Sequence, residues 1–407
     1  MNVRKDAIYS TLSIILFNGS RWFYNSFAAR FLTASDFSLF SFVLTSSNLV
    51  LPLFTFGVNL GLIREVPILL KKGKGEILYI EQMFWGYIIL ISIAAFIFSL
   101  ILSKFTKIGF STFAIVITVS LVLSILVFIQ SILKAFSLFL EEFKISLTFS
   151  FFMLAVIVLW FVSGTYCFEY AILFFLIPML IATGYGIRKA SHIQLFSFKP
   201  NFKVKPFVSN YLKYGSHEIL VAIYTNSVSF LSFFILTSTE YAIFRKILLV
   251  SIPFTMISGS ISQVFLNKFS VIYVTDRSSL KKFFRKTQKL YLLAGIIGYV
   301  IAICIFFPVS SLIKLEKQYL LLYSILSLSI LFRFISSLYG IFLTTIGFQT
   351  LRVITVMIAA LSSIFLLLIL TPSLGLWGVV ISYISSFFVI LTIYFYFGEL
   401  KVLRGSK

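Results

Sequence analysis

The basic residues of this 407-residue chain are divided unevenly among the junctions between long apolar segments, and this division constrains the fold most strongly. A hydrocarbon core of roughly 30 Å requires about 20 apolar residues in helical form. Twelve apolar runs of about that length cover most of the sequence. Of the 34 Lys and Arg residues, 25 lie at every second junction and only five at the alternate ones. We therefore expect an all-α integral membrane protein.

Basic residues remain on the cytoplasmic side of a membrane. Because the basic junctions include both ends of the chain, we expect cytoplasmic termini and an even number of spans. The basic junctions are the N-terminus with Arg4 and Lys5, residues 64–76, 134–144, 188–213 and 268–289, Arg352, and the tail with Lys401, Arg404 and Lys407. The predicted spans are near residues 7–29, 36–63, 78–102, 112–133, 145–163, 168–187, 214–236, 240–267, 290–312, 319–343, 351–370 and 374–397.

The two halves of the chain contain a similar segment. Thr33–Phe40 and Thr237–Phe244, 204 residues apart, each contain a hydroxyl residue, an acid, an aromatic residue and a Phe three positions later. Such a repeat indicates two six-helix lobes related by an axis along the membrane normal. Chance similarity between two common helix starts is the alternative. The predicted organisation is an N-terminal lobe and a C-terminal lobe around a central cavity. The N-terminal lobe is at 1–187, a cytoplasmic basic linker at 188–213, the C-terminal lobe at 214–397 and a cytoplasmic tail at 398–407.

The predicted linker combines charge with aromatic residues. It holds six basic residues, interleaved with Phe196, Phe198, Phe202, Phe207 and Tyr211. This composition suits a segment that lies on an anionic membrane leaflet. A solvated cytoplasmic linker is an equally good interpretation.

Several functional classes are disfavoured. The net charge of +21 is accounted for mainly by topology, so we expect no nucleic-acid partner. Cys167 and Cys304 are far apart and provide neither a disulfide framework nor metal-ligand spacing. Gly73-Lys74-Gly75 lacks the spacing of a nucleotide-binding loop. No arrangement typical of a catalytic triad is present, so we expect neither an enzyme nor a cofactor.

Charges inside the membrane are costly and usually face a cavity. Arg21 lies fourteen residues into the first predicted span, about 21 Å at roughly 1.5 Å per residue, which is too deep for easy extension to the cytoplasmic surface. Pairing with backbone carbonyls between helices is the alternative for Arg21. Arg333 lies in the middle of the tenth span, and its equivalent in the first repeat is near Gln130. We therefore predict that both these spans face the cavity.

Four further polar residues are candidates. Arg245 and Lys246 lie about a turn and a half from the outer end of the eighth span, where they can either line the cavity or extend to the surface. His217 and Glu218 are predicted to lie one turn inside the seventh span, as a pair for coupling or, preferably, as a polar cluster at a helix start. Counted together, the interior has four permanent cations and one clear carboxylate, so an anionic substrate is expected.

Small residues and prolines indicate where helices can approach closely or bend. Gly57, Gly61 and Gly378 are expected to permit close approach of neighbouring helices, although ordinary packing also explains them. Pro52 and Pro253 occupy equivalent predicted spans and are expected to bend them.

Short motifs at both ends of the chain resemble the polysaccharide flippase (Wzx, O-antigen transporter) family of the multidrug, oligosaccharidyl-lipid and polysaccharide exporter superfamily. The resemblance is carried by Ala29-Arg30-Phe31-Leu32, Asp36-Phe37, Phe40, Gly57-Val58-Asn59, Arg64-Glu65 and Leu374-Gly375-Leu376-Trp377-Gly378-Val379-Val380-Ile381-Ser382.

The resemblance implies a flippase. It would move an undecaprenyl-diphosphate-linked oligosaccharide, the O-antigen repeat unit, from the cytoplasmic to the periplasmic leaflet of a bacterial inner membrane by alternating access. Membrane lipids, a polysaccharide polymerase and a chain-length regulator are the further partners expected. The alternatives are a capsule or teichoic-acid exporter of the same fold, a cation-coupled multidrug exporter, and a membrane scaffold that does not transport.

Overall fold

Long helices make up nearly all of this computed structural model, which describes the backbone of residues 3–59, 61, 62, 74–106, 108–192, 198–276 and 278–404. The α-helices are α1 (Val3–Phe31), α2 (Ala34–Thr55), α4 (Lys74–Phe105), α5 (Phe110–Ala135), α6 (Phe139–Ser163), α7 (Phe168–His192), α8 (Val204–Ile235), α9 (Ser238–Thr275), α10 (Leu280–Leu312), α11 (Leu320–Thr345), α12 (Gln349–Leu374) and α13 (Leu376–Arg404), with a 3₁₀ turn at Lys317–Tyr319. Among the described residues, ten of these helices are long and apolar enough to cross a membrane.

The predicted fold class is therefore confirmed. Each predicted span except the second coincides with one long helix over most of its length. α8 and α10 begin about ten residues before the corresponding predicted spans. α1 and α9 are the two long helices outside the group of ten. α1 contains the predicted interior cation Arg21, and α9 contains the predicted interior cations Arg245 and Lys246.

The repeated segment has the same local structure in both halves. Thr33 caps the N-terminus of α2, where its hydroxyl accepts a hydrogen bond from the Asp36 backbone N–H. Thr237 caps α9 in the same way, and the Glu240 carboxylate also accepts from the Thr237 backbone N–H. These side chains satisfy backbone donors that a helix start leaves unpaired. The shared sequence pattern thus encodes two equivalent helix starts.

The second span differs from the prediction of a continuous helix over residues 36–63. α2 ends at Thr55, and Phe56 and Gly57 adopt left-handed backbone conformations with φ of 43° and 74°. A Cβ at Gly57 would overlap the backbone of Tyr214 and Gly215 in α8. Only glycine permits both the positive φ and this approach. The apolar pattern continued through this turn, so hydrophobicity alone did not reveal it.

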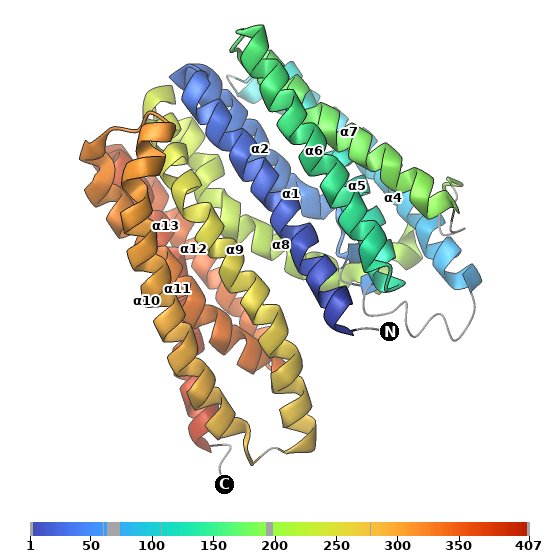
Figure 1. Ribbon diagram of the computed structural model, residues 1–407, viewed down its shortest axis with the longest axis vertical. Coiled ribbons are helices and arrows are strands. Elements are labelled where there is room, and N and C mark those ends of the chain that lie inside the picture. Colours follow the sequence, from blue (N-terminus) through green and yellow to red (C-terminus); the bar gives the residue numbers. More distant parts are fainter. Residues whose placement is uncertain are drawn as a thin grey trace. The chain divides into compact units, whose positions relative to one another are not determined.

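Contacts between residues divide the chain into two compact units, Met1–Asn226 and Ser227–Lys407. In the first unit, α1 packs against α6, α6 against α7, and α2 against α5 (Figure 1). The phenol of Tyr24 is fully buried, donates a 2.6 Å hydrogen bond to the Ala171 carbonyl and stacks on Trp160 at 5.5 Å. Tyr24 thus joins α1 to both α6 and α7.

The predicted linker region contributes to the core of the first unit. The Asn201 backbone N–H donates to the Gln82 carbonyl of α4 at 2.8 Å. Phe207 and Tyr211, in the first turns of α8, are buried in a cluster with residues of α4 and α5. Phe198 and Phe202 remain exposed. Only these two of the four described aromatic residues are therefore available to a membrane surface.

In the second unit, α11 packs against α9, α10 and α13, and α12 packs against α13. α9 and α10 are consecutive helices that run side by side in opposite directions (Figure 1). The C-terminal end of α13 lies near the start of α10, where Arg285 and Glu399 form an ion pair at 2.6 Å. α11 is thus the central helix of this unit.

Some predicted features lie outside the described residues. They include most of the basic junction at 64–76 with the Arg64-Glu65 motif, as well as Lys107 and Lys407. The side chains of Arg4 and Lys5 also lie outside the described set.

Candidate functional site

Two of the predicted arginines lie near a single tyrosine in the second unit. Arg245 is in the second turn of α9, Arg333 is in the middle of α11, and Tyr383 is in the second turn of α13. The charges of both guanidinium groups act on the Tyr383 phenol. The Phe244 ring packs against the Tyr383 ring, with centroids 6.4 Å apart. Three helices thus bring two cations and a phenol together.

No carboxylate of this unit neutralises the two arginines. The sequence after Ser227 contains four acidic residues. Glu240 caps α9, Asp276 binds Ser278 and Ser279, Glu316 binds Gln318, and Glu399 pairs with Arg285. The Nε of Arg245 is buried and has no partner among the described residues. The described part of the second unit thus leaves the Nε–H of Arg245 without an acceptor and both arginines without an ion pair.

Lys246 is separated from Arg245 although the two are adjacent in sequence. Its ammonium group donates to the Lys314 carbonyl, 3.5 Å away, just after the end of α10. Consecutive residues on a helix face directions about 100° apart, since a turn has 3.6 residues. Lys246 therefore stabilises exposed carbonyls at a helix end, which is a favourable place for a cation.

Arg21 lies in the first unit with a neutral partner. Its Nη2 donates to the Asn48 Oδ1 of α2 at 3.4 Å, and its guanidinium lies 5.6 Å from the centre of the Phe17 ring. One turn further along α1, the Oδ1 of Asn25 is buried without a partner among the described residues. None of the ion pairs between described residues includes Arg21. This side of α1 is therefore cationic and polar.

Gln130 belongs to a network that joins α1, α5 and α6. Its amide donates to the Ser146 hydroxyl at 3.2 Å, and Ser146 lies 2.6 Å from the Ser13 hydroxyl. Ser13 donates to Glu142, which pairs with Lys134 at 3.2 Å. The repeat equivalent of Arg333 therefore contacts helix-bridging residues inside the first unit.

Glu218 lies deeper in its helix than the sequence predicts. α8 begins at Val204, about ten residues before the predicted span, so Glu218 is about four turns from the helix start and does not belong to a polar cluster at that start. Its carboxylate accepts a 3.1 Å hydrogen bond from the Thr55 hydroxyl and another from the Gly57 backbone N–H. The neighbouring His217 also has an interaction partner. Glu218 thus binds the interrupted end of α2.

Sequence reasoning missed Tyr383, Asn48 and the partners of Glu218. Tyr383 is one of 20 tyrosines in apolar surroundings, and no local pattern distinguishes it. A useful signal for Thr55 and Gly57 was the combination of proline, hydroxyl residue and glycine at 52, 55 and 57, which is typical of a helix interruption.

Comparison by sequence gives no relative, since neither a protein-family model nor a curated protein matches the chain. Comparison by structure gives several. The chain aligns with an inward-facing multidrug resistance MATE family transporter of the MOP superfamily at a TM-score of 0.77 and 11% identity, covering 98% of both chains.

Two further similar structures have related folds. The lipid II flippase MurJ, in an inward closed conformation, aligns at a TM-score of 0.68 and 17% identity, over 98% of this chain and 89% of MurJ. A MOP superfamily transporter from Pyrococcus furiosus, described as having a binding pocket of reversed polarity, aligns at 0.71 and 11% identity, over 99% and 96%. At these identities the similarity establishes the fold, which is that of MATE and MurJ transporters.

Proposed function

We propose that this protein is a flippase that carries an undecaprenyl-diphosphate-linked oligosaccharide, the O-antigen repeat unit, across a bacterial inner membrane by alternating access. The proposed direction is from the cytoplasmic to the periplasmic leaflet, with both termini cytoplasmic. The observation that carries the proposal is the cluster of Arg245, Arg333 and Tyr383, whose cations have no carboxylate partner among the described residues.

The chemistry of the cluster suits a diphosphate. A diphosphate headgroup cannot cross hydrocarbon unaided, because each desolvated polar group costs several kcal/mol. Guanidinium groups replace the lost water with charge-assisted hydrogen bonds and can bind phosphate oxygens in pairs. Tyr383 supplies a further hydroxyl donor. Arg21, with Asn48 and Asn25 nearby, gives the first unit a similar cationic and polar group.

Two alternatives use the same fold. A capsule or teichoic-acid exporter would require the same phosphate recognition and differs only in the sugar or polyol carried. A cation-coupled multidrug exporter is suggested by the similarity to a MATE transporter. Cationic drugs call for free carboxylates, however, and each acid of the second unit binds another described group.

The test is transport by the full chain in proteoliposomes that contain the lipid-linked oligosaccharide. An external glycosidase reports the sugars that have reached the outer face. We expect sugar exposure with the wild type, a loss of at least tenfold with Arg333→Ala and Arg245→Ala, and wild-type rates with Lys317→Ala, which removes an exposed charge outside the cluster. Transport of ethidium without movement of the oligosaccharide would instead establish the drug exporter. Transport of lipid-linked polymers that differ in composition from the oligosaccharide would favour the capsule or teichoic-acid exporter.

A further inference from the structure

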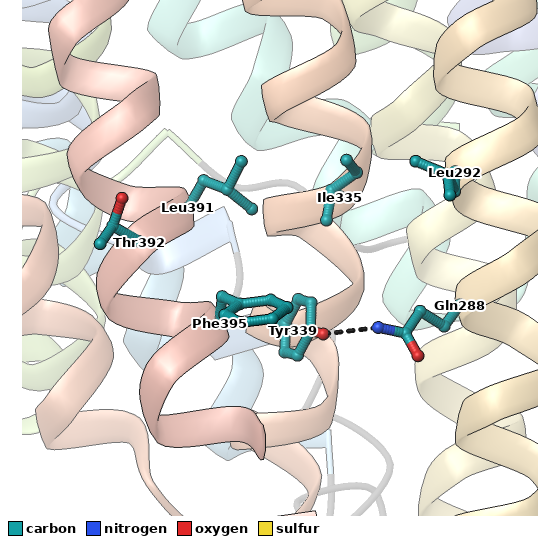
Figure 2. A pocket seen from close by; sticks show the side chains of 7 residues that line it. All are labelled: Gln288, Leu292, Ile335, Tyr339, Leu391, Thr392 and Phe395. Carbon is teal, nitrogen blue, oxygen red and sulfur yellow. Dashed lines mark hydrogen bonds between the residues drawn. The ribbon is translucent and has the colours of Figure 1, made fainter. Parts of the chain in front are cut away.

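A cavity of about 410 Å³ lies between α10 and α13 in the second unit, with α11 as its floor. Figure 2 shows its lining: three residues of α13 and two of α10 on opposite sides, with two of α11 between them. The lining residues are Gln288, Leu292, Ile335, Tyr339, Leu391, Thr392 and Phe395. Its volume is within the range of roughly 300–1,000 Å³ that is typical of small-ligand sites.

The cavity opens on an exposed, apolar face of the second unit. Leu292 is 44% exposed and Phe395 is 49% exposed, at opposite edges of the cavity. Further along α10, Leu293 and Ile297 are also exposed. α10 and α13 are both long and apolar enough to cross a membrane, so a lipid chain has the right chemistry to fill this groove.

The polar end of the groove is a closed network. The amide of Gln288 donates to the Tyr339 hydroxyl at 2.7 Å, and Tyr339 donates to Glu399 at 2.6 Å. Arg285 donates to both oxygens of Glu399, at 2.8 and 2.6 Å, and to the Gln288 carbonyl oxygen at 2.8 Å. The carboxylate is thus neutralised, and the groove beyond Gln288 is apolar. It therefore suits a hydrocarbon chain.

Cations lie immediately beyond this polar end. Lys281, Arg285, Gln288 and Leu292 are spaced by four, three and four residues, so they lie along one face of α10. Lys281 is exposed and is about 10 Å, or two turns, before Gln288. Its ammonium group forms none of the ion pairs between described residues. Arg285 uses three of its five N–H donors in the network, which leaves two.

We propose that this groove binds an anionic phospholipid, with one acyl chain in the apolar cavity and the phosphate on Lys281 and the remaining donors of Arg285. Basic pockets between membrane helices are suited to such headgroups. In the proposed topology the site faces the cytoplasmic leaflet. The binding itself requires only the membrane-spanning fold and is independent of the transported substrate.

α10 provides a matched pair of variants. Lys281→Gln and Lys286→Gln each remove one exposed charge from the same helix, but residue 286 lies about 140° around the helix from residue 281. A third variant, Thr392→Trp, fills the cavity and leaves every charge in place. As a control, each purified variant should show a cooperative thermal unfolding transition, which establishes that it is folded.

The experiment is native mass spectrometry of the full chain, titrated with phosphatidylglycerol or phosphatidylcholine. We expect one tightly bound phosphatidylglycerol per chain and weaker binding of phosphatidylcholine. Lys281→Gln should reduce the affinity for phosphatidylglycerol about fivefold, and Lys286→Gln less than twofold. Thr392→Trp should abolish the tight site for both lipids.

Three outcomes would overturn the proposal. Equal losses in the two lysine variants would mean general surface attraction and not a site. Equal affinity for the two lipids would remove the role of the anionic headgroup. Displacement of phosphatidylglycerol by low concentrations of undecaprenyl phosphate would assign the groove to the tail of a polyprenyl substrate.

Discussion

The hydroxyl of Thr55 donates a hydrogen bond of 3.1 Å to the carboxylate of Glu218, 163 residues further along the chain. The same carboxylate accepts from the backbone N–H of Gly57. Thr55 is the last residue of α2, and Gly57 is part of the left-handed turn that interrupts it. Backbone that departs from helix geometry inside a membrane needs such a partner, because lipid provides none. Glu218 therefore stabilises the interruption.

Replacing Glu218 should lower stability in a graded way. Glu218→Ala removes the acceptor for two donors, and hydrogen bonds to a charged group contribute about 1.5–3 kcal/mol. Glu218→Gln retains one acceptor oxygen and should lose less. Thermal unfolding in detergent measures both, with Glu169→Ala, an exposed carboxylate, as the control. An unchanged unfolding midpoint for Glu218→Ala would contradict this assignment.

Gly57→Ala should be strongly destabilising. The added Cβ would overlap the backbone of α8, and the left-handed conformation alone costs an L-residue about 1–2 kcal/mol. Gly19→Ala is the matched control, because no atom outside its own helix lies within 4 Å of the added Cβ. Alanine in a helix interior is favoured over glycine by about 1 kcal/mol, so this variant should be neutral or stabilising. Similar yields and unfolding midpoints for the two variants would be incompatible with the close crossing.

Arg21 and Arg333 should be required for export, one in each unit. Arg→Ala at either position is expected to abolish surface polysaccharide while the protein remains in the membrane, since the headgroup loses its charge-assisted donors. Arg→Lys should restore export only partly, because lysine lacks paired, planar donors. Polysaccharide is measured on intact cells of a complemented deletion strain, and immunoblots of membranes control for protein level. Wild-type export by both alanine variants would rule out the site.

Reporter fusions should reveal alternating sides of the membrane. A reporter fused after Lys71 should be cytoplasmic and one after Lys107 periplasmic. Lys71 belongs to one of the junctions that together hold 25 basic residues, whereas Lys107 belongs to the alternate junctions, which hold five. Alkaline phosphatase and green fluorescent protein fusions provide complementary signals. Finding both fusion points on one side would refute the proposed topology.

Flipping should respond to membrane potential. An anionic headgroup that leaves a negative interior gains about 2.3 kcal/mol per charge per 100 mV, less any contribution from arginines that move with it. In proteoliposomes, rates should follow an imposed potassium-diffusion potential and persist after the pH gradient is collapsed. Rates that follow the pH gradient and vanish in a folded Glu218→Gln variant would instead indicate proton coupling.

The sequence predicted the helices well because apolar length and charge placement are local properties. Span positions agree to within a few residues at the outer helix ends, such as Phe110 and Leu312. The interruption at Phe56 and Gly57 was missed because its residues continue an apolar run. Its cause, the approach of α8 at Gly215, depends on contacts more than 150 residues away.

The candidate site was predictable in kind but not in detail. Arg245 and Arg333 were identified because charge is conspicuous in an apolar segment. Their proximity to Tyr383 depends on the packing of α9, α11 and α13, which no single segment encodes. The separation of Lys246 from Arg245 follows from helix geometry once the partner at Lys314 is known. The sequence thus identifies the charged residues that are costly to place in a membrane, and helix packing determines which of them lie close together.

The burial of Phe207 and Tyr211 in the first unit also bears on biosynthesis. Both residues belong to α8, whose last turns, after Asn226, belong to the second unit. A nascent chain that has emerged only as far as α7 lacks two aromatic side chains of its own core. At roughly 5–20 residues per second, the ribosome adds the missing turns within a few seconds. The core of the first unit is therefore completed only when the first turns of α8 have been synthesised.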